Sequence, residues 1–367
     1  MKRKIKILVD AHIFDHSFQG TSSYLLGLYS ALVQLENFEI TLCAQNVPKL
    51  KELFSDERFS YRKLESNSRY KRLFFEYPRI IDEGGYDYAH FQYVVPFVKK
   101  CRFINTMHDL LFLDYKKYFS WKYRFSRALS FWYSAKRSDI LLTVSDYSRE
   151  KIADKFSIDS SKIYVTPNAV GQYEDSSIDI SEKYGLDNYI LYVSRFEPRK
   201  NQISLVEVFK DTKIHDKGYQ LVFVGSKKQD IEKDYFDRLQ HYIQRENIEG
   251  VHFFEGLSWP DLNAFYQQAE CFAFPSLAEG FGIPPLEAAV NRCKVITSDK
   301  TAMADFDFFK YRIDPNDLIE FGEKLEEALN DIDYPFEAIK KKIEKQYNWS
   351  TIAEDFSRVV IKNFKNI

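Results

Sequence analysis

Two glutamates, Glu279 and Glu287, lie on either side of one turn and could bind a single polyhydroxylated ligand. Seven residues separate them in the string Glu-Gly-Phe-Gly-Ile-Pro-Pro-Leu-Glu. The apolar run 271–274 before the turn predicts a buried strand. The two prolines after the turn predict the first turn of a helix, where proline is tolerated. The alternative is an ordinary strand–turn–helix junction with two solvent-exposed glutamates.

The turn itself supplies backbone groups that suit an anionic or hydroxylated ligand. Gly280 and Gly282 let the main chain approach a ligand closely because they carry no side chain. Phe281 and Ile283 complete the segment that leads into the helix. The unpaired N–H groups and the positive dipole end of a helix start attract a phosphate or an electron-rich hydroxyl.

A second charged group follows the strand-like run 189–193. The string Arg-Phe-Glu-Pro-Arg-Lys-Asn places Arg195 and Lys200 five residues apart around a proline-containing turn. Open α/β sheets bind ligands at the carboxyl ends of their strands. Both cations could therefore bind one diphosphate and neutralise a departing nucleoside diphosphate. Arg199 is a weaker candidate, and a solvated basic loop is the alternative.

The first half of the chain offers polar residues at further strand ends. Gly20 and Thr21 open a helix after the first strand, so their amides could reach a phosphate. His108 ends a later strand and could contact a substrate hydroxyl or transfer a proton. His90 ends a neighbouring strand and is a weaker candidate for an acceptor contact. For either histidine, an ordinary core or surface residue is the alternative.

These strings resemble the signatures of a large family of retaining glycosyltransferases that use nucleotide-sugar donors and have the GT-B fold. The family's Glu-x7-Glu signature matches Glu279 and Glu287, and its Arg-x4-Lys-Asn motif matches Arg195 and Lys200. The resemblance implies that Glu279 contacts the donor sugar and Glu287 the ribose. It also implies that the two cations hold the donor phosphates and that His108 lies beside the donor sugar.

The resemblance covers nearly the whole chain and is strongest over residues 138–285. Gln19 stands where the family often has a second glycine, which weakens the transfer of a phosphate-binding role to Gly20. After Glu287 the family's Gly-x-Pro string is replaced at 289–294, and its later Pro-Glu pair is absent at 301–305. No function is therefore carried over to that region.

The organisation of the chain is predicted by strand-like runs that alternate with helical patterns. The runs are 5–9, 40–43, 86–90, 103–106, 140–144, 163–165, 189–193, 220–224, 252–254, 271–274 and 295–297. Such alternation predicts parallel sheets flanked by helices. Two series of about 170 residues each predict an α/β protein with two Rossmann-like domains.

We expect an N-terminal acceptor-binding domain over 1–172, a donor-binding domain over 173–346 and a helical segment over 347–367. By resemblance to GT-B proteins, the two domains face each other across a cleft. The same resemblance implies that the last helix crosses back and packs on the first domain.

The composition and the motifs that are missing argue against several other classes of protein. The net charge of −2 gives little support to nucleic-acid binding. The four cysteines form no CxxC pair, no apolar run reaches transmembrane length and no secretory signal is visible, which favours a cytoplasmic protein. The dinucleotide string GxGxxG is absent after the first strand. Two DxD strings, at 305–307 and 331–333, follow no convincing strand, so we predict no metal and no cofactor beyond the donor substrate.

Basic and aromatic residues alternate over 115–137 and again over 69–79. Such segments can lie on anionic lipid, which would make the protein peripheral on the inner face of the cytoplasmic membrane. The alternative is a helix with a buried aromatic face and a solvated basic face.

The sequence therefore predicts a retaining hexosyltransferase. It would move a sugar from a nucleotide diphosphate-sugar to a glycan or lipid-linked acceptor in surface polysaccharide or lipopolysaccharide biosynthesis. The string Glu-Pro-Arg-Lys-Asn, which contains Lys200, resembles that of mannosyl- and rhamnosyl-type transferases. This resemblance favours GDP-mannose as the donor. The alternatives are a catalytically silent nucleotide-sugar-binding or scaffold relative, and another GT-B enzyme such as a sugar-nucleotide epimerase.

Overall fold

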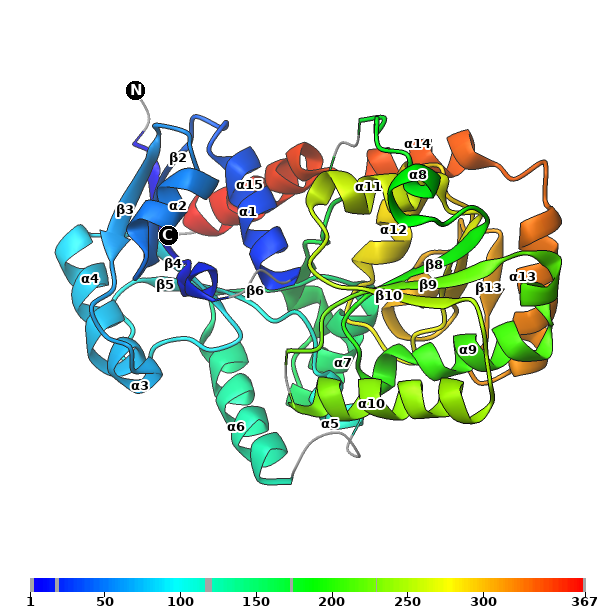
Figure 1. The fold of residues 1–367 in the computed structure, drawn as a ribbon. Coiled ribbons are helices and arrows are strands. Elements are labelled where there is room, and N and C mark those ends of the chain that lie inside the picture. The colour runs from blue at the N-terminus through cyan, green and yellow to red at the C-terminus, as the bar shows by residue number, and fades with distance from the viewer. Residues whose placement is uncertain (1–2, 17–19, 116–120, 172–173, 229, 366–367) are drawn as a thin grey trace. The chain divides into compact units, whose positions relative to one another are not determined.

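The computed structural model describes residues 3–16, 20–115, 121–171, 174–228 and 230–365 (Figure 1). The chain folds into two compact units. Unit 1 contains residues 1–169 and 347–367, and unit 2 contains residues 170–346. The boundary predicted after residue 172 falls at 172–173, outside the described residues.

Unit 1 is built on a parallel sheet with the strand order β3-β2-β1-β4-β5-β6-β7. Its strands are β1 (Ile5–Asp10), β2 (Phe38–Ala44), β3 (Phe59–Lys63), β4 (Tyr88–Gln92), β5 (Arg102–Thr106), β6 (Ile140–Thr143) and β7 (Ile163–Val165). The order reverses between β1 and β4, so the carboxyl ends of these two strands form the switch point at which such sheets bind ligands.

The helices of unit 1 lie between these strands, with one late exception. They are α1 (Gly20–Leu32), α2 (Val47–Leu53), α3 (Arg69–Lys71), α4 (Tyr77–Gly84), α5 (Leu111–Asp114), α6 (Trp121–Arg137), α7 (Asp146–Phe156) and α15 (Trp349–Lys365), with a π-helical turn η2 (Arg72–Glu76) joining α3 to α4. The exception, α15, packs along α1. There is no room for a side chain at Gly27 of α1, because a Cβ atom would stand 1.9 Å from the Trp349 ring.

Unit 2 repeats the design with a six-stranded parallel sheet in the order β10-β9-β8-β11-β12-β13. Its strands are β8 (Tyr189–Val193), β9 (Gln220–Val224), β10 (Val251–Phe254), β11 (Cys271–Phe274), β12 (Val295–Ser298) and β13 (Tyr311–Ile313). Here the switch point lies between β8 and β11. The central strands are buried on both sides, as expected for a sheet covered by helices on both faces.

Two groups of helices cover the sheet of unit 2 (Figure 1). One group contains α9 (Gln202–Asp211), α10 (Asp230–Arg245) and α13 (Leu318–Asn330), and the other contains α8 (Ile180–Tyr184), α11 (Trp259–Gln268), α12 (Ile283–Val290) and α14 (Phe336–Gln346). Every predicted strand run overlaps an observed strand, and the predicted α/β class with two Rossmann-like sheets is confirmed. Within the described ranges, no helix has both the length and the apolarity needed to cross a membrane.

Candidate donor site and comparison with known proteins

The loops that follow β8 and β11 in unit 2 are hydrogen-bonded to each other. The amide of Leu277 donates to the carbonyl of Arg199 at 2.8 Å, and the Asn201 side-chain amide donates to the carbonyl of Pro275 at 3.2 Å. Because β8 and β11 are neighbours in the sheet, these bonds join the two predicted ligand-binding loops into one structure.

Glu279 is the centre of this structure. Its buried carboxylate accepts from Lys200 Nζ, from Arg199 Nη1 at 3.0 Å and from Ser276 Oγ at 2.8 Å. The Lys200 ammonium also lies 5.1 Å from the centroid of the Phe274 ring. The structure therefore brings Glu279 and Lys200 together and adds Arg199, which the motif comparison had ranked below them.

The cations and carboxylates continue outward as an alternating chain. Arg199 Nε contacts Glu197 at 2.7 Å, and Arg195 contacts the same carboxylate at 2.7 Å. Arg195 also contacts the buried Glu232 of α10 at 3.1 Å. Three cations and three carboxylates thus alternate, which holds Arg195, Arg199 and Lys200 at defined positions.

The environment favours the ionised form of Glu279. Burial by itself raises the pKa of this carboxyl, but Lys200, Arg199 and the hydrogen bonds from Lys200 and Ser276 outweigh burial and lower the pKa to about 2. Burial acts on Lys200 in the opposite way and lowers its pKa from the usual value, against the effect of Glu279. The pair is therefore an ion pair at neutral pH.

A tight turn explains how consecutive side chains reach the same carboxylate. The residues Pro198–Lys200 form a single 3-10 turn, which ends at Asn201 with the left-handed φ of 57°. Asparagine tolerates this conformation better than most residues. The buried Tyr192 hydroxyl donates to the Lys200 carbonyl at 2.6 Å and fixes the turn on β8.

The second glutamate lies in α12, which begins at Ile283 as predicted. Gly282 precedes the helix with φ of 102°, and a side chain there would also crowd Met303 at 3.1 Å, so this position requires glycine. Phe281 is buried beside it. Glu287 is half-buried, and one of its oxygens accepts from the Tyr266 hydroxyl at 3.0 Å. No hydrogen bond or ion pair links Glu287 with Glu279 among the contacts resolved in the described residues.

In unit 1, His108 follows β5 and is largely buried between two tyrosine rings, with ring centroids 5.0 Å from Tyr24 and 5.4 Å from Tyr93. Its Nε2 lies 2.7 Å from the Gln92 side-chain oxygen, which assigns the proton to Nε2 and leaves Nδ1 as an acceptor. Burial lowers the pKa of His108 to about 3. His108 is thus neutral at pH 7 and suited to accept a hydroxyl hydrogen bond rather than to donate a proton as an acid.

His90 does not face a ligand site, so its interpretation as an acceptor contact is wrong. Its ring is fully buried, with Nδ1 2.7 Å from the Tyr29 hydroxyl and Nε2 2.7 Å from the Thr106 hydroxyl. It also stacks on Phe356 of α15, with the ring centroids 6.0 Å apart. Both ring nitrogens have hydrogen-bond partners, so His90 is a structural residue of the core of unit 1.

Both buried histidines are expected to stay neutral across the physiological pH range. The pKa of His90 is also lowered to about 3, first by burial and then by His108. Because the unfolded chain protonates near pH 6.5, stability is expected to fall as pH drops from about 6.5 towards 3. Histidine proton resonances in a pH titration test this directly, since titration of either ring near pH 6.5 would contradict the assignment.

Gly20 and Thr21 begin α1, and open space surrounds Gly20 where a side chain would project. The neighbouring Gln19 lies outside the described residues. Each of the two DxD strings forms an ion pair with a lysine side chain of the protein. Asp331 contacts Lys310 at 2.7 Å, and Asp307 contacts Lys342 at 3.0 Å. Among described residues, no group of three metal-ligating side chains lies close enough together to hold a metal ion.

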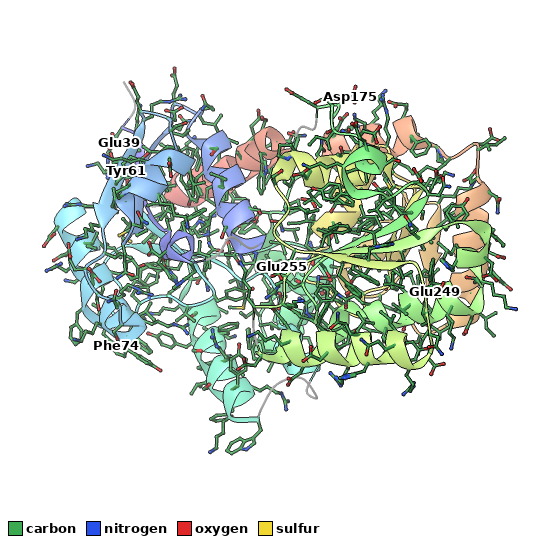
Figure 2. The ribbon with its side chains drawn as sticks, viewed as in Figure 1. Glu39, Tyr61, Phe74, Asp175, Glu249 and Glu255 are labelled. Atoms are coloured by element: carbon green, nitrogen blue, oxygen red, sulfur yellow. The ribbon has the colours of Figure 1, made fainter. Side chains whose placement is uncertain are left out.

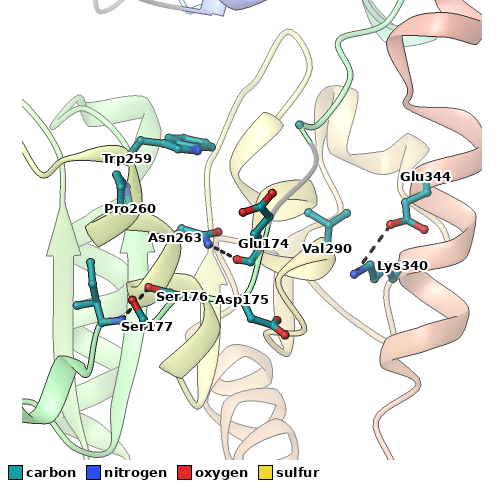
Figure 3. Close-up of a pocket in the computed structure, with 12 residues that line it drawn as sticks. Glu174, Asp175, Ser176, Ser177, Trp259, Pro260, Asn263, Val290, Lys340 and Glu344 are labelled. Atoms are coloured by element: carbon teal, nitrogen blue, oxygen red, sulfur yellow. Dashed lines mark hydrogen bonds and ion pairs between the residues drawn. The ribbon is translucent and has the colours of Figure 1, made fainter.

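Unit 2 also has a cavity of about 590 Å³ that does not involve these residues (Figure 3). Trp259 and Asn263 lie on one side, and Lys340 and Glu344 of α14 lie on the other. Asn263 donates to the carbonyl of Glu174 at 2.8 Å. None of the charged residues around Glu279 lines this cavity.

Two family models match the chain, one for each half. The model described as Glycosyl transferases group 1 matches residues 174–347. The model described as Glycosyltransferase Family 4 matches residues 18–171. Together the two matches span nearly the whole chain.

Two curated relatives are similar over part of their length. O-antigen chain mannosyltransferase RfbU of Salmonella typhimurium is 33% identical over 195 residues, which cover 53% of this chain and 51% of that protein. O-antigen chain mannosyltransferase B of Escherichia coli is 26% identical over 263 residues, which cover 68% of this chain and 67% of that protein. The chain therefore spans about half the length of the first relative and two thirds of the second.

Among solved structures, sucrose-phosphate synthase (tll1590) from Thermosynechococcus elongatus superposes with a TM-score of 0.78 at 16% identity, covering 100% of both chains. At this identity the likeness concerns the fold, and it confirms the predicted GT-B class. With a family model matched in each unit and the motif residues in place after β8 and β11, the chain belongs to the group 1, family 4-like glycosyltransferases.

Proposed function

We propose that the protein transfers a hexose, with retention of configuration, from a nucleotide diphosphate-sugar to a glycan or lipid-linked acceptor in surface polysaccharide biosynthesis. The observation that carries this proposal is the joined pair of loops after β8 and β11, where Arg195, Arg199 and Lys200 alternate with carboxylates. GDP-mannose is the favoured donor, because the relatives are named as O-antigen chain mannosyltransferases.

In this proposal the cations bind the donor diphosphate. Arg195 keeps a side chain that is 42% exposed, so it can reach a ligand, while Lys200 is buried and already desolvated. A buried ammonium stabilises the charge that develops on a departing diphosphate more strongly than one in water. Arg199 holds Glu279 in place from the other side.

The carboxylates and the turn bind the remaining parts of the donor. Glu279 is ionised and accepts hydroxyls of the sugar, and Glu287 accepts hydroxyls of the ribose with its orientation set by Tyr266. The amides of Gly280–Ile283 lie at the N-terminal end of α12, where partial positive charge favours oxygen ligands. Within unit 1, His108 Nδ1 can accept a hydrogen bond from a substrate hydroxyl, and the amides at the helix start of Gly20 and Thr21 can bind a phosphate.

A thermal-shift screen against GDP-, UDP-, dTDP- and ADP-sugars, with and without EDTA, tests the donor. A ligand present at about one hundred times its Kd adds about 2.7 kcal/mol to the free energy of unfolding. We expect stabilisation by one nucleotide class, without an effect of EDTA, and release of free nucleotide when acceptor glycan is added. Binding without turnover on any acceptor would favour the silent relative, and conversion of the donor without an acceptor would favour an epimerase.

The acceptor side carries a surface that suits anionic lipid. On α6 the side chains of Trp121, Phe125, Leu129 and Trp132 are exposed and recur at helical spacing, so they form one stripe. Phe131 of the same helix is buried and packs on Tyr93 and Phe112, so α6 covers only part of its aromatic side chains. The predicted segment also includes residues 116–120, which lie outside the described residues.

The stripe continues onto neighbouring segments of unit 1. Phe74, on the outer surface of η2 (Figure 2), stacks on Phe97 with ring centroids 4.4 Å apart. Phe97 in turn stacks on Tyr133 of α6 at 5.0 Å. Lys122 Nζ lies 5.9 Å from the centroid of the Trp121 ring in the stripe. Basic and aromatic side chains together bind anionic interfaces through apolar and electrostatic contributions. We propose that this aromatic surface docks on an anionic membrane.

Co-sedimentation with phosphatidylglycerol vesicles tests the membrane proposal. The double substitution Trp121→Ala and Phe125→Ala is expected to weaken binding at least about tenfold, because both exposed rings would lose their interfacial contacts. Trp259→Ala is the matched control, since this tryptophan is also exposed but lies on unit 2. Equal binding of the double variant and the control would contradict the proposal, as would equal binding to phosphatidylcholine vesicles.

A further inference from the structure

A second cavity, of about 390 Å³, lies in unit 1 at the switch point of its sheet. Asp10 at the end of β1 and Gln92 at the end of β4 both line it. Its wall also includes Tyr93, which has a left-handed φ of 64° that tyrosine rarely adopts. Strained residues of this kind cluster at ligand sites, where the surrounding structure enforces them.

Three arginines from two separate segments line this cavity. Arg69 and Arg72 come from α3 and η2, and Arg127 comes from α6. Arg72 is buried, and its two resolved side-chain hydrogen bonds start from Nη1 and end on the carbonyls of Ser66 and Asn67. Among described residues, none of the three guanidinium groups forms an ion pair with a carboxylate of this chain.

The carboxylates nearby are engaged elsewhere. Asp10 accepts from the Tyr77 hydroxyl and lies 2.6 Å from the His12 ring nitrogen Nδ1, and the Asp10 carboxylate raises the pKa of that histidine. Glu76 accepts from the amide of Glu65 at 2.6 Å. The cavity therefore has an excess of positive charge that its own acidic residues do not balance.

Such convergence is unfavourable without an anion. Burial lowers the pKa of Arg69 below its usual value, and repulsion from Arg127 lowers it further. Guanidinium groups bind phosphate oxygens with paired hydrogen bonds, and a phosphate or diphosphate presents enough oxygens and charge for three of them. A neutral sugar would leave these cations uncompensated.

The two segments that carry these arginines also carry exposed apolar side chains. Arg69 precedes Tyr70, whose side chain is 74% exposed, and the helix that carries Arg127 exposes Phe125 and Leu129 on a different side. The anion-binding groups and the surface proposed to meet lipid therefore share the same two segments.

We propose that Arg69, Arg72 and Arg127 bind a phosphate or diphosphate group of the acceptor substrate. This inference rests on the proposed transferase function and specifies it, because it makes the acceptor a phosphorylated molecule. The phosphoryl group is either free in solution, as on a sugar phosphate, or carried by a lipid whose hydrocarbon chain contacts the aromatic surface.

Calorimetric titration with pyrophosphate, geranyl diphosphate and geraniol tests this site without any sugar transfer. The Lys200→Met chain is used throughout, because it lacks the buried ammonium proposed to bind the donor diphosphate, which should weaken diphosphate binding in unit 2. We expect diphosphate binding to persist in this chain and geraniol, which lacks the anion, not to bind. The added pair Arg69→Gln and Arg127→Gln is expected to weaken binding about a hundredfold, or about tenfold for each charged hydrogen-bonding group lost.

Arg72 is left intact because it also holds the backbone at Ser66 and Asn67. Arg79→Gln is the matched control, since Arg79 is an exposed arginine of the same unit that pairs with Glu83. Equal affinity for both diphosphates would identify a free phosphoryl group, and binding of geranyl diphosphate alone would identify a lipid-borne one. Absence of binding by either probe, or equal affinity in the double variant and the control, would overturn the proposal while leaving the donor-site results standing.

Discussion

Substitution of Lys200 by methionine is expected to lower kcat about 10²- to 10³-fold, the effect of removing one preorganised charge from a developing anion. The Lys200 ammonium is buried and bonded to Glu279, so its charge acts in a low dielectric. Methionine keeps most of the apolar stem and removes the ammonium, whose nitrogen lies 5.1 Å from the centroid of the Phe274 ring. Steady-state transfer assays and nucleotide titration measure the change.

Lys210→Met is the appropriate control for this experiment. Lys210 is in the next helix, α9, and pairs with Glu246 at 3.3 Å on the surface. We expect transfer and nucleotide affinity to be unchanged in this variant. If Lys200→Met transferred sugar at the rate of the control, the diphosphate would not be bound by this group.

Substitution of Glu279 by glutamine is expected to destabilise the protein by about 3 kcal/mol, because the buried Lys200 and Arg199 lose their shared carboxylate. Wild-type stability should also depend on pH through this group. Its pKa is about 2 in the folded chain against 4.5 for an unperturbed glutamate, so its contribution is present above pH 4.5 and lost as pH falls towards 2. Urea unfolding at pH 7, 4 and 3 measures both effects.

The glutamine variant should lack this acid-sensitive part of the stability. Adding Lys200→Met to Glu279→Gln removes one uncompensated charge, so the double variant should be more stable than Glu279→Gln alone. If Glu279→Gln unfolded at the wild-type urea concentration, the network around Glu279 would not contribute to the fold.

The residues proposed for the donor site were matched through their motifs, whereas their contacts with one another could not be predicted from the sequence. The motif comparison matched Lys200 and ranked Arg199 second, because Arg199 lies outside the positions that the motif specifies. In the structure, the 3-10 turn ending at Asn201 brings both side chains to the same carboxylate. Only the backbone conformation, which the residue types do not specify uniquely, decides this.

Two strands were missed, and both lie at sheet edges. In β3 (Phe59–Lys63) only Phe59 is buried, so the segment lacks the apolar run by which the central strands are recognised. The strand β13 (Tyr311–Ile313) is three residues long, too short to show a periodic pattern. Edge strands pair on one side only and depend less on continuous hydrophobicity.

Contacts between residues that are distant in sequence could not be predicted from local sequence patterns. His90 and His108 both lie near strand ends, yet His90 is enclosed by Tyr29, Thr106 and Phe356. Thr106 lies on β5 and Phe356 lies on α15. Likewise, Arg127 joins Arg69 only because α6 returns to the same end of the sheet. Such groupings follow from topology, which periodicity predicts only in outline.

The position of α15 has a consequence for how the chain folds during synthesis. Arg102 donates to the carbonyl of Asn363 at 2.7 Å, and His90 stacks on Phe356, so α15 completes the core of the unit that contains β1. All of residues 170–346 must therefore leave the ribosome before the first-made unit can close its core. Domains usually fold in the order of their synthesis, whereas here the inserted unit is positioned to fold first while the N-terminal sheet waits for its last helix.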